Sequence, residues 1–114
     1  MFGEGMPGYL IPITLCVINA AMIVSFGDDE TEKVWNGERS RRLPSDIQAI
    51  ALRKLRLINA ARKVDDLRAP PGNRLEQLKG DRAGRWSIRI NNQWRITFHW
   101  TEGGAEHVAI VDYH

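Results

Sequence analysis

Three neighbouring side chains at the C-terminal end of the sequence can exchange protons. They are the carboxyl group of Asp112, the phenol of Tyr113 and the imidazole of His114. Cleavage of RNA by its own 2′-hydroxyl needs a base for the 2′ proton, cations to stabilise the crowded phosphorane and an acid for the departing 5′ oxygen. That reaction requires no metal ion. The three residues are therefore candidates for proton transfer in such a reaction, and the alternative is a polar tail in solvent.

Positively charged side chains that suit the same reaction precede this group. The stretch from position 74 to position 95 holds two acidic residues and six cations: Arg74, Lys79, Arg82, Arg85, Arg89 and Arg95. Arg95 and Lys79 are candidates for stabilising the phosphorane, because cations placed where negative charge develops lower the barrier. Glu76 is a further candidate for the base or the acid.

Two stretches alternate between apolar and polar residues, which is typical of half-buried strands. In residues 94–100 the apolar set is expected to face the core, and Arg95 falls on the other face, in what we expect to be the central strand. A charge there is unfavourable without a partner or a purpose. The remaining basic residues of this face are candidates for binding the RNA backbone, with a solvated outer face as the alternative: Arg74, Arg82, Arg85, Arg89 and His99.

The composition describes one globular domain. The 114 residues include 26% charged and 43% hydrophobic residues, which excludes a disordered tail, a collagen-like fibre and a disulfide-stapled miniprotein. The one cysteine, Cys16, cannot form an internal disulfide. The net charge is only +2, yet 12 of the 16 cations are Arg, whose planar fork suits phosphate.

The first 21 residues differ from the rest. No charged residue occurs from Gly5 to Gly27, and the apolar run of residues 10–21 is interrupted by Pro12. The run is too short for a membrane-spanning helix. A secretory signal is the alternative, but no Lys or Arg precedes the run. We expect residues 1–21 to be an upstream extension outside the core and residues 22–114 to form a single domain.

The order of the predicted elements places the strands after the helices. A short strand at residues 23–26 leads to a helix capped by Asp28 and ended by Gly37. A second helix follows Pro44, where Ser45 and Gln48 match a capping box. Strands are then expected at residues 74–78, 85–90, 94–100 and 107–113. The prediction is an α+β fold in which two N-terminal helices pack on a twisted, mainly antiparallel sheet of four to five strands.

The sequence resembles a known toxin family. PPGNRLEQLKGDRAGRWSIRINNQWRITFHW, followed by IVDYH, is similar to the HigB-like plasmid-maintenance killer toxins of the RelE/ParE superfamily. L-K-G-D-R-x-G-x-W-S-I-R, N-x-Q-W-R-I-x-F and D-Y-H occur in the order and spacing of the family. The resemblance covers the chain from MIVSF to the end, which is all of it except residues 1–21.

The resemblance implies a compact fold of the RelE, microbial-ribonuclease type and a ribosome-dependent, metal-independent mRNA endonuclease that needs no cofactor. It implies a cytoplasmic toxin silenced by a helix-turn-helix, HigA-like antitoxin, with operator DNA bound only through the complex and no membrane partner. Lys79 and Arg95 match the family's cationic positions. The C-terminal cluster of Asp112, Tyr113 and His114 matches the catalytic one.

One position departs from the family pattern. Glu76 stands where some members have histidine, and a carboxylate accepts a proton but repels a phosphate. The order of catalytic roles therefore stays open. Two other functions also stay open: a ParE-like toxin that inhibits a protein target such as gyrase without cleaving RNA, and an RNA-binding module without catalysis.

Overall fold

The computed structural model describes residues 22–79 and 84–112, so the expectation for residues 1–21 falls outside it. In this part of the chain, α2 (Asp29–Trp35) and α3 (Ser45–Ala60) come first. Two 3₁₀ turns follow, η1 (Val64–Arg68) and η2 (Pro71–Asn73), and four strands complete the order. No helix of these residues is both long and apolar enough to cross a membrane.

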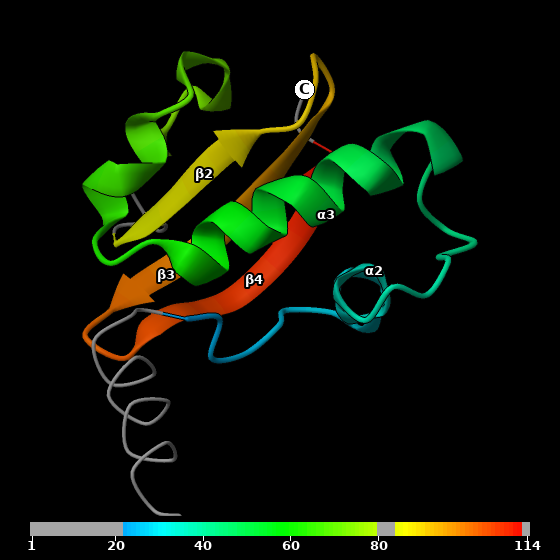
Figure 1. Cartoon of the computed structure of the whole chain (residues 1–114), viewed down its shortest axis with the longest axis horizontal. Helices are drawn as coiled ribbons and strands as arrows, with labels where there is room; N and C mark the ends of the chain where they lie inside the picture. Colours follow the sequence, from blue (N-terminus) through cyan, green and yellow to red (C-terminus); the bar gives the residue numbers. More distant parts are fainter. Residues whose placement is uncertain (1–21, 80–83, 113–114) are drawn as a thin grey trace, which may run out of the picture.

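The four strands form one antiparallel sheet in the order β1-β2-β3-β4 (Figure 1). Their bounds are β1 (Glu76–Gln77), β2 (Arg85–Arg89), β3 (Trp94–Thr101) and β4 (Gly104–Asp112). Two helices followed by an antiparallel sheet is the predicted architecture, and the prediction is confirmed. The strand of residues 94–100 is indeed internal, because β3 lies between β2 and β4.

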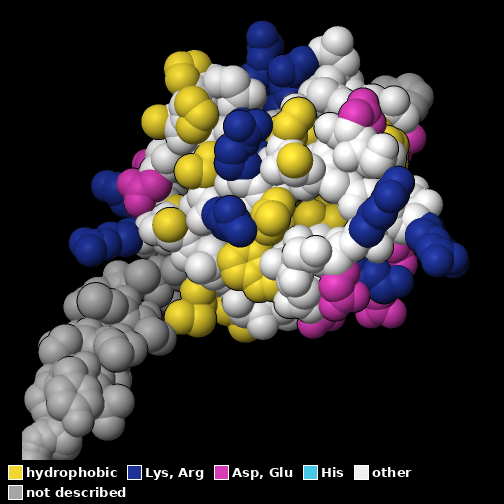
Figure 2. All heavy atoms as spheres, turned by 45° about the vertical axis from the view of Figure 1, so that its right-hand side comes forward, with side chains coloured by type: hydrophobic (Ala, Val, Ile, Leu, Met, Phe, Trp, Pro, Cys, Tyr) yellow, Lys and Arg dark blue, Asp and Glu magenta, His cyan; other side chains and the backbone are white. Residues whose placement is uncertain are grey.

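The core lies between α3 and one face of the sheet (Figure 1). From α3 it takes Ile47, Ala51, Leu55 and Ile58, and from the strands it takes Ile88, Ile96, Phe98, Val108 and Ile110. The tryptophans at positions 86, 94 and 100 pack against this cluster as expected. Hydrophobic side chains also reach the surface across the middle of the face in Figure 2, with Lys and Arg around them. The opposite face of the sheet, hereafter the open face, carries the alternate residues of each strand.

The two helices begin differently. Asp28 caps α2 as predicted, because its Oδ1 accepts a hydrogen bond from the Thr31 amide at 2.7 Å. The capping box predicted for α3 is wrong: Pro44 is the N-cap and no side chain caps the helix. The amide of Gln48 instead donates to the carbonyls of Ser40 and Leu43, both at 2.8 Å. The preceding loop is buried at Ser40, and its backbone groups need these partners.

Residues 22–27 run along the outer edge of β4 (Figure 1). They make two isolated parallel bridges, at Ile23 and Phe26, where the sequence predicted a strand. Side chains complete the edge: the Ser25 hydroxyl accepts from the His107 amide at 2.9 Å, and the Thr31 hydroxyl accepts from the Ile110 amide at 2.9 Å. The segment and the first turn of α2 thereby occupy backbone groups that an edge strand otherwise exposes.

Strand β4 starts three residues earlier than predicted, at Gly104. The pairing of β3 with β4 shifts register between Thr97 and His99, and His107 has a positive φ of 54°. Both features mark an irregularity in β4 that the alternation of residues alone does not reveal. Gly104 itself has a φ of 127° and lies directly against the backbone of Met22.

Candidate active site

Three rows of side chains cross the open face, because paired residues on neighbouring strands share a face. Between β2 and β3 the pairs are Arg85 with His99, Ser87 with Thr97, and Arg89 with Arg95. The predicted basic residues of the two strands therefore do lie on one surface, opposite α3. Of the other candidates, Arg74 and Lys79 are exposed beside β1, and Arg82 lies outside the described residues.

Arg95 is buried at the centre of this face, with 9% of its surface exposed. Its Nε donates to the Ser87 hydroxyl at 2.9 Å. Its Nη2 donates to the carbonyls of Arg74 at 2.6 Å and Ser87 at 3.3 Å. These bonds provide the partners that a buried charge requires, and they fix the guanidinium in one position.

Sequence reasoning did not identify the two residues that hold Arg95. Ser87 stands between Arg85 and Arg89 in the alternating strand, so its place on the same face was predictable. The Arg74 carbonyl was not, because it depends on the left-handed backbone of Arg74, whose φ is 44°.

Glu76 is the acidic neighbour of Arg95. Its Oε1 lies 3.6 Å from Nη2 of Arg95, and 58% of the Glu76 side chain is exposed. In the sheet Glu76 pairs with Ser87, which already contacts Arg95. The structure thus places a solvent-accessible carboxylate, a group that can accept a proton, beside a buried cation.

Asp112 ends β4 one position away from the partner of Arg95. Asp112 pairs with Trp94 and Val111 pairs with Arg95, so the Cβ atoms of Asp112 and Arg95 leave the sheet on opposite faces. The Asp112 carboxylate accepts a hydrogen bond from Nε2 of Gln93 at 3.0 Å. Tyr113 and His114, the other members of the predicted cluster, lie outside the described residues.

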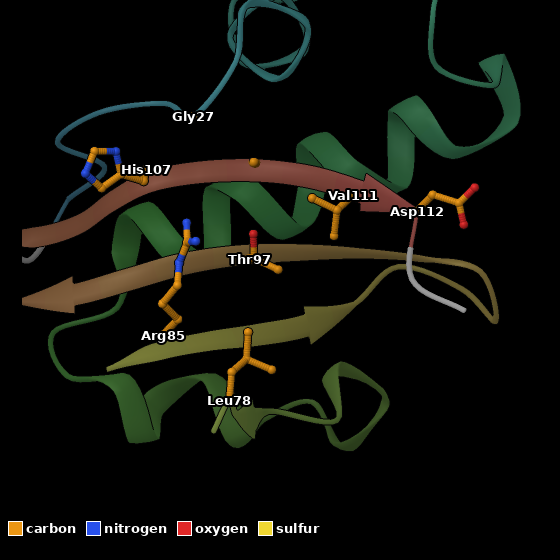
Figure 3. Close-up of a pocket in the computed structure, with 8 residues that line it drawn as sticks. Gly27, Leu78, Arg85, Thr97, His107, Val111 and Asp112 are labelled. Carbon is orange, nitrogen blue, oxygen red and sulfur yellow. The ribbon is translucent and has the colours of Figure 1, made fainter. Parts of the chain in front are cut away.

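A hollow of about 260 Å³ opens on this face next to β4 (Figure 3). Arg85 and Thr97 reach into it, and Asp112 points away at the end of its strand (Figure 3). The complete lining is Gly27, Leu78, Arg85, Thr97, His107, Ala109, Val111 and Asp112. His107 was not predicted to belong here, because its place depends on the irregularity in β4.

Within residues 22–79 and 84–112, no group of three His, Cys, Asp or Glu side chains is arranged to hold a metal ion. The charged groups nearest the open face are mostly cations. On the other side of the sheet, Lys54 of α3 is half-buried: burial lowers the pKa of its ammonium group, and the positive charges of Arg53 and Arg89 lower it further.

A family model and similar sequences agree on one family. The family model described as "RelE-like toxin of type II toxin-antitoxin system HigB" matches residues 24–114. Toxin HigB-1 of Vibrio cholerae is 42% identical over 85 residues, which are 74% of this chain and 90% of that protein. Endoribonuclease HigB of Proteus vulgaris is 39% identical over 61 residues, 54% of this chain and 65% of that protein. Among solved structures, a YoeB/ParE toxin from Agrobacterium tumefaciens aligns with a TM-score of 0.45 and 20% identity, covering 82% of this chain and 98% of the other.

Proposed function

Since this chain belongs to the HigB-like, RelE-related toxins of type II toxin–antitoxin systems, we propose that it is an endoribonuclease that cleaves messenger RNA on the ribosome. A homologue, 39% identical, bears the name endoribonuclease HigB. The observation that supports this activity best is the immobilised guanidinium of Arg95 beside the carboxylate of Glu76, on a face lined with cations.

The proposed reaction is in-line attack of a 2′-hydroxyl on the adjacent phosphate. The 2′ oxygen forms a bond to phosphorus while the bond to the 5′ oxygen breaks, which leaves a cyclic phosphate and a free 5′-hydroxyl. Arg95, together with the exposed Lys79, would meet the charge of the phosphorane. Because Arg95 is already held by Ser87 and Arg74, it needs little reorganisation as that charge develops.

Proton transfer is assigned to a set of residues without an order of roles. Glu76, Asp112, Tyr113 and His114 would take the 2′ proton and protonate the leaving oxygen. The reaction so written needs neither metal ion nor cofactor. The remaining cations of the open face, Arg74, Arg82, Arg85, Arg89 and His99, would hold the RNA strand across the sheet.

The proposed partners are those expected of the toxin of a type II toxin–antitoxin system. A type II toxin is paired with an antitoxin, and we propose a helix-turn-helix, HigA-like protein in this role. Operator DNA would be bound only through their complex. Because its substrates would be ribosomes and mRNA, the toxin would act in the cytoplasm. The active domain would be residues 22–114, and residues 1–21 would be an extension that the domain does not require.

The test is to incubate the protein with mRNA in the presence and absence of ribosomes. Cleavage that requires ribosomes supports the proposal, whereas cleavage of free RNA contradicts the ribosome dependence. Absence of any cleavage, combined with inhibition of DNA gyrase by the same preparation, would establish the ParE-like function instead. If the protein binds RNA but neither cleaves it nor inhibits gyrase, the protein is an RNA-binding module without catalysis.

Glu76→Gln is expected to slow cleavage on ribosomes by about a hundredfold or more, the contribution typical of a general acid or base. The change removes the proton acceptor 3.6 Å from Arg95 while keeping the shape of the side chain. It also removes a negative charge that repels phosphate, so RNA binding should become tighter as kcat falls. The measurement is single-turnover cleavage combined with an RNA titration.

The matched control is Glu106→Gln. Glu106 is another carboxylate of the sheet, paired with His99 in register and hydrogen-bonded to Thr101 at 3.3 Å. Its substitution should leave cleavage within about twofold of the original. If Glu76→Gln behaves like this control, Glu76 takes no part in proton transfer.

A further inference from the structure

A second basic site adjoins the open face at the edge of β2. The two-residue strand β1 pairs only with Trp86 and Ser87, so Arg89 lies beyond it. The turn η2 packs against β2 instead and leads into Arg74. We use the name edge cluster for four cations at this edge: Arg53, Lys54, Arg74 and Arg89.

The position of Lys54 is fixed by a buried amide. Its Nζ donates a hydrogen bond to Oδ1 of Asn73, a residue with no exposed surface. Asn73 in turn donates from Nδ2 to the carbonyls of Leu67 at 3.1 Å and Ala69 at 3.2 Å. The ammonium group is therefore held on a rigid part of the fold and does not move freely in solvent.

The edge cluster brings like charges together. Arg53 and Arg89 both act on Lys54 strongly enough to lower the pKa of its ammonium group, in addition to the effect of burial. Arg89 donates a hydrogen bond to the neutral Oδ1 of Asn92, and the exposed side chain of Arg74 follows Asn73 directly. Among residues 22–79 and 84–112, no carboxylate forms an ion pair with any of the four. Mutual repulsion of this kind is relieved when an anion binds.

The edge cluster is continuous with the candidate active site. Arg89 pairs with Arg95 across β2 and β3, and the Arg74 carbonyl accepts the hydrogen bond from Arg95. A strand of nucleic acid that places one phosphate at Arg95 would therefore meet this edge as it leaves the sheet. Three of the four cations are Arg, whose planar fork can contact two phosphate oxygens at once.

From these observations we propose that the edge cluster binds the phosphodiester backbone of the RNA strand, at phosphates next to the one that is cleaved. This inference rests on the proposed endoribonuclease function, and it extends the RNA path from Arg74 and Arg89 to Arg53 and Lys54 of α3. The site contributes affinity and positioning that do not depend on base sequence.

The test compares two double variants of equal net charge. Arg53→Gln/Arg89→Gln removes two cations from the edge cluster. The control Arg39→Gln/Arg41→Gln removes two exposed cations from the loop between α2 and α3. Binding of a single-stranded RNA oligonucleotide is measured over a series of salt concentrations. Each lost phosphate contact should reduce the slope of log K against log[salt] by about 0.7, so we expect the edge variant to lose about 1.4 and the control to keep the original slope.

Cleavage on ribosomes gives a second readout. The edge variant should raise KM and leave kcat nearly unchanged, because the lost contacts hold RNA equally in the ground state and the transition state. Unchanged melting temperatures would show that neither variant has altered the fold.

The proposal is overturned if the original protein does not bind the oligonucleotide, if the edge variant keeps the original slope, or if the control loses as much. Unchanged RNA binding with weaker binding of the antitoxin would assign the edge cluster to an acidic protein partner. If the protein shows the expected salt dependence but cleaves no RNA on ribosomes, the edge cluster is an RNA-binding site and the proposed endoribonuclease function is wrong.

Discussion

Arg95→Ala is expected to slow mRNA cleavage on ribosomes by about a hundredfold or more, the usual loss when one preorganised stabilising donor is removed. The guanidinium is fixed by its bonds to Ser87 and Arg74 before RNA arrives. Negative charge gathers on the phosphate oxygens only as the phosphorane forms, so the loss should fall on kcat more than on ribosome association. Single-turnover cleavage and co-sedimentation with ribosomes measure the two effects separately.

The same substitution should also destabilise the protein. Without Arg95, the Ser87 hydroxyl and the Arg74 carbonyl lose their donor, and an unsatisfied buried group costs about 1–3 kcal/mol. Ser87→Ala is the control for this structural component, because it removes one bond to Nε and keeps the guanidinium. It should lower the melting temperature but retain most of the cleavage. If folded Arg95→Ala protein cleaves as fast as the original, the catalytic site lies elsewhere and a protein target becomes the better explanation.

Gly104→Ala is expected to have the largest effect on stability among the glycine substitutions in the described part of the chain. Gly104 has a φ of 127°, a conformation that costs other residues about 1–3 kcal/mol. A Cβ there would also lie 2.1 Å from the carbonyl oxygen and 2.9 Å from the nitrogen of Met22, both of which are backbone atoms. The backbone of residues 22–27 must therefore move away from β4, which adds to the loss.

Gly103→Ala is the matched control. The nearest atom to its added Cβ is the Thr101 hydroxyl oxygen at 3.8 Å, which is ordinary contact, so stability should change by no more than about 0.5 kcal/mol. Urea unfolding measures both variants. Hydrogen exchange at Val24 and Gly27 reports on the edge directly, because their amides bond to the carbonyls of Ala105 and Val108. Equal stability of the two variants would contradict the tight approach of Met22 to Gly104.

Much of the fold was predictable because the elements follow local rules. The alternation around Ile88 and Ile96 indicated both strands and the faces that they bury. Tertiary contacts decided what local rules did not. Local rules allowed Gln48 to cap α3, but its side-chain amide donates instead to the carbonyl of Ser40 in the buried loop. The start of β4 was missed because its irregularity at His107 depends on the segment beside it.

In the candidate site, too, the sequence predicts the placement of residues along the strands but not the contacts between distant segments. The alternation of residues along β2 and β3 placed Arg85, Arg89 and Arg95 on one face, and the structure has them there. Ser87 follows from the same alternation, but the second partner of Arg95 could not be predicted, because the Arg74 carbonyl lies 21 positions away in the sequence. For the edge cluster, the sequence shows that Arg53 and Lys54 belong to a basic helix. Only the hydrogen bond to the buried amide of Asn73 shows that Lys54 is fixed at this edge.

The pairing of residues 22–27 with β4 bears on the order in which the molecule is made. The Ser25 hydroxyl meets the His107 amide across 82 positions, and Thr31 meets Ile110 across 79. Ser25 and Thr31 are synthesised long before β4, so these contacts cannot form until β4 has been made. Closing so long a stretch of chain is also entropically unfavourable. A nascent chain that lacks β4 has neither a sealed sheet nor the strand that ends at Asp112. We therefore expect the fold to close, and the proposed activity to appear, only after β4 has left the ribosome on which the chain is made.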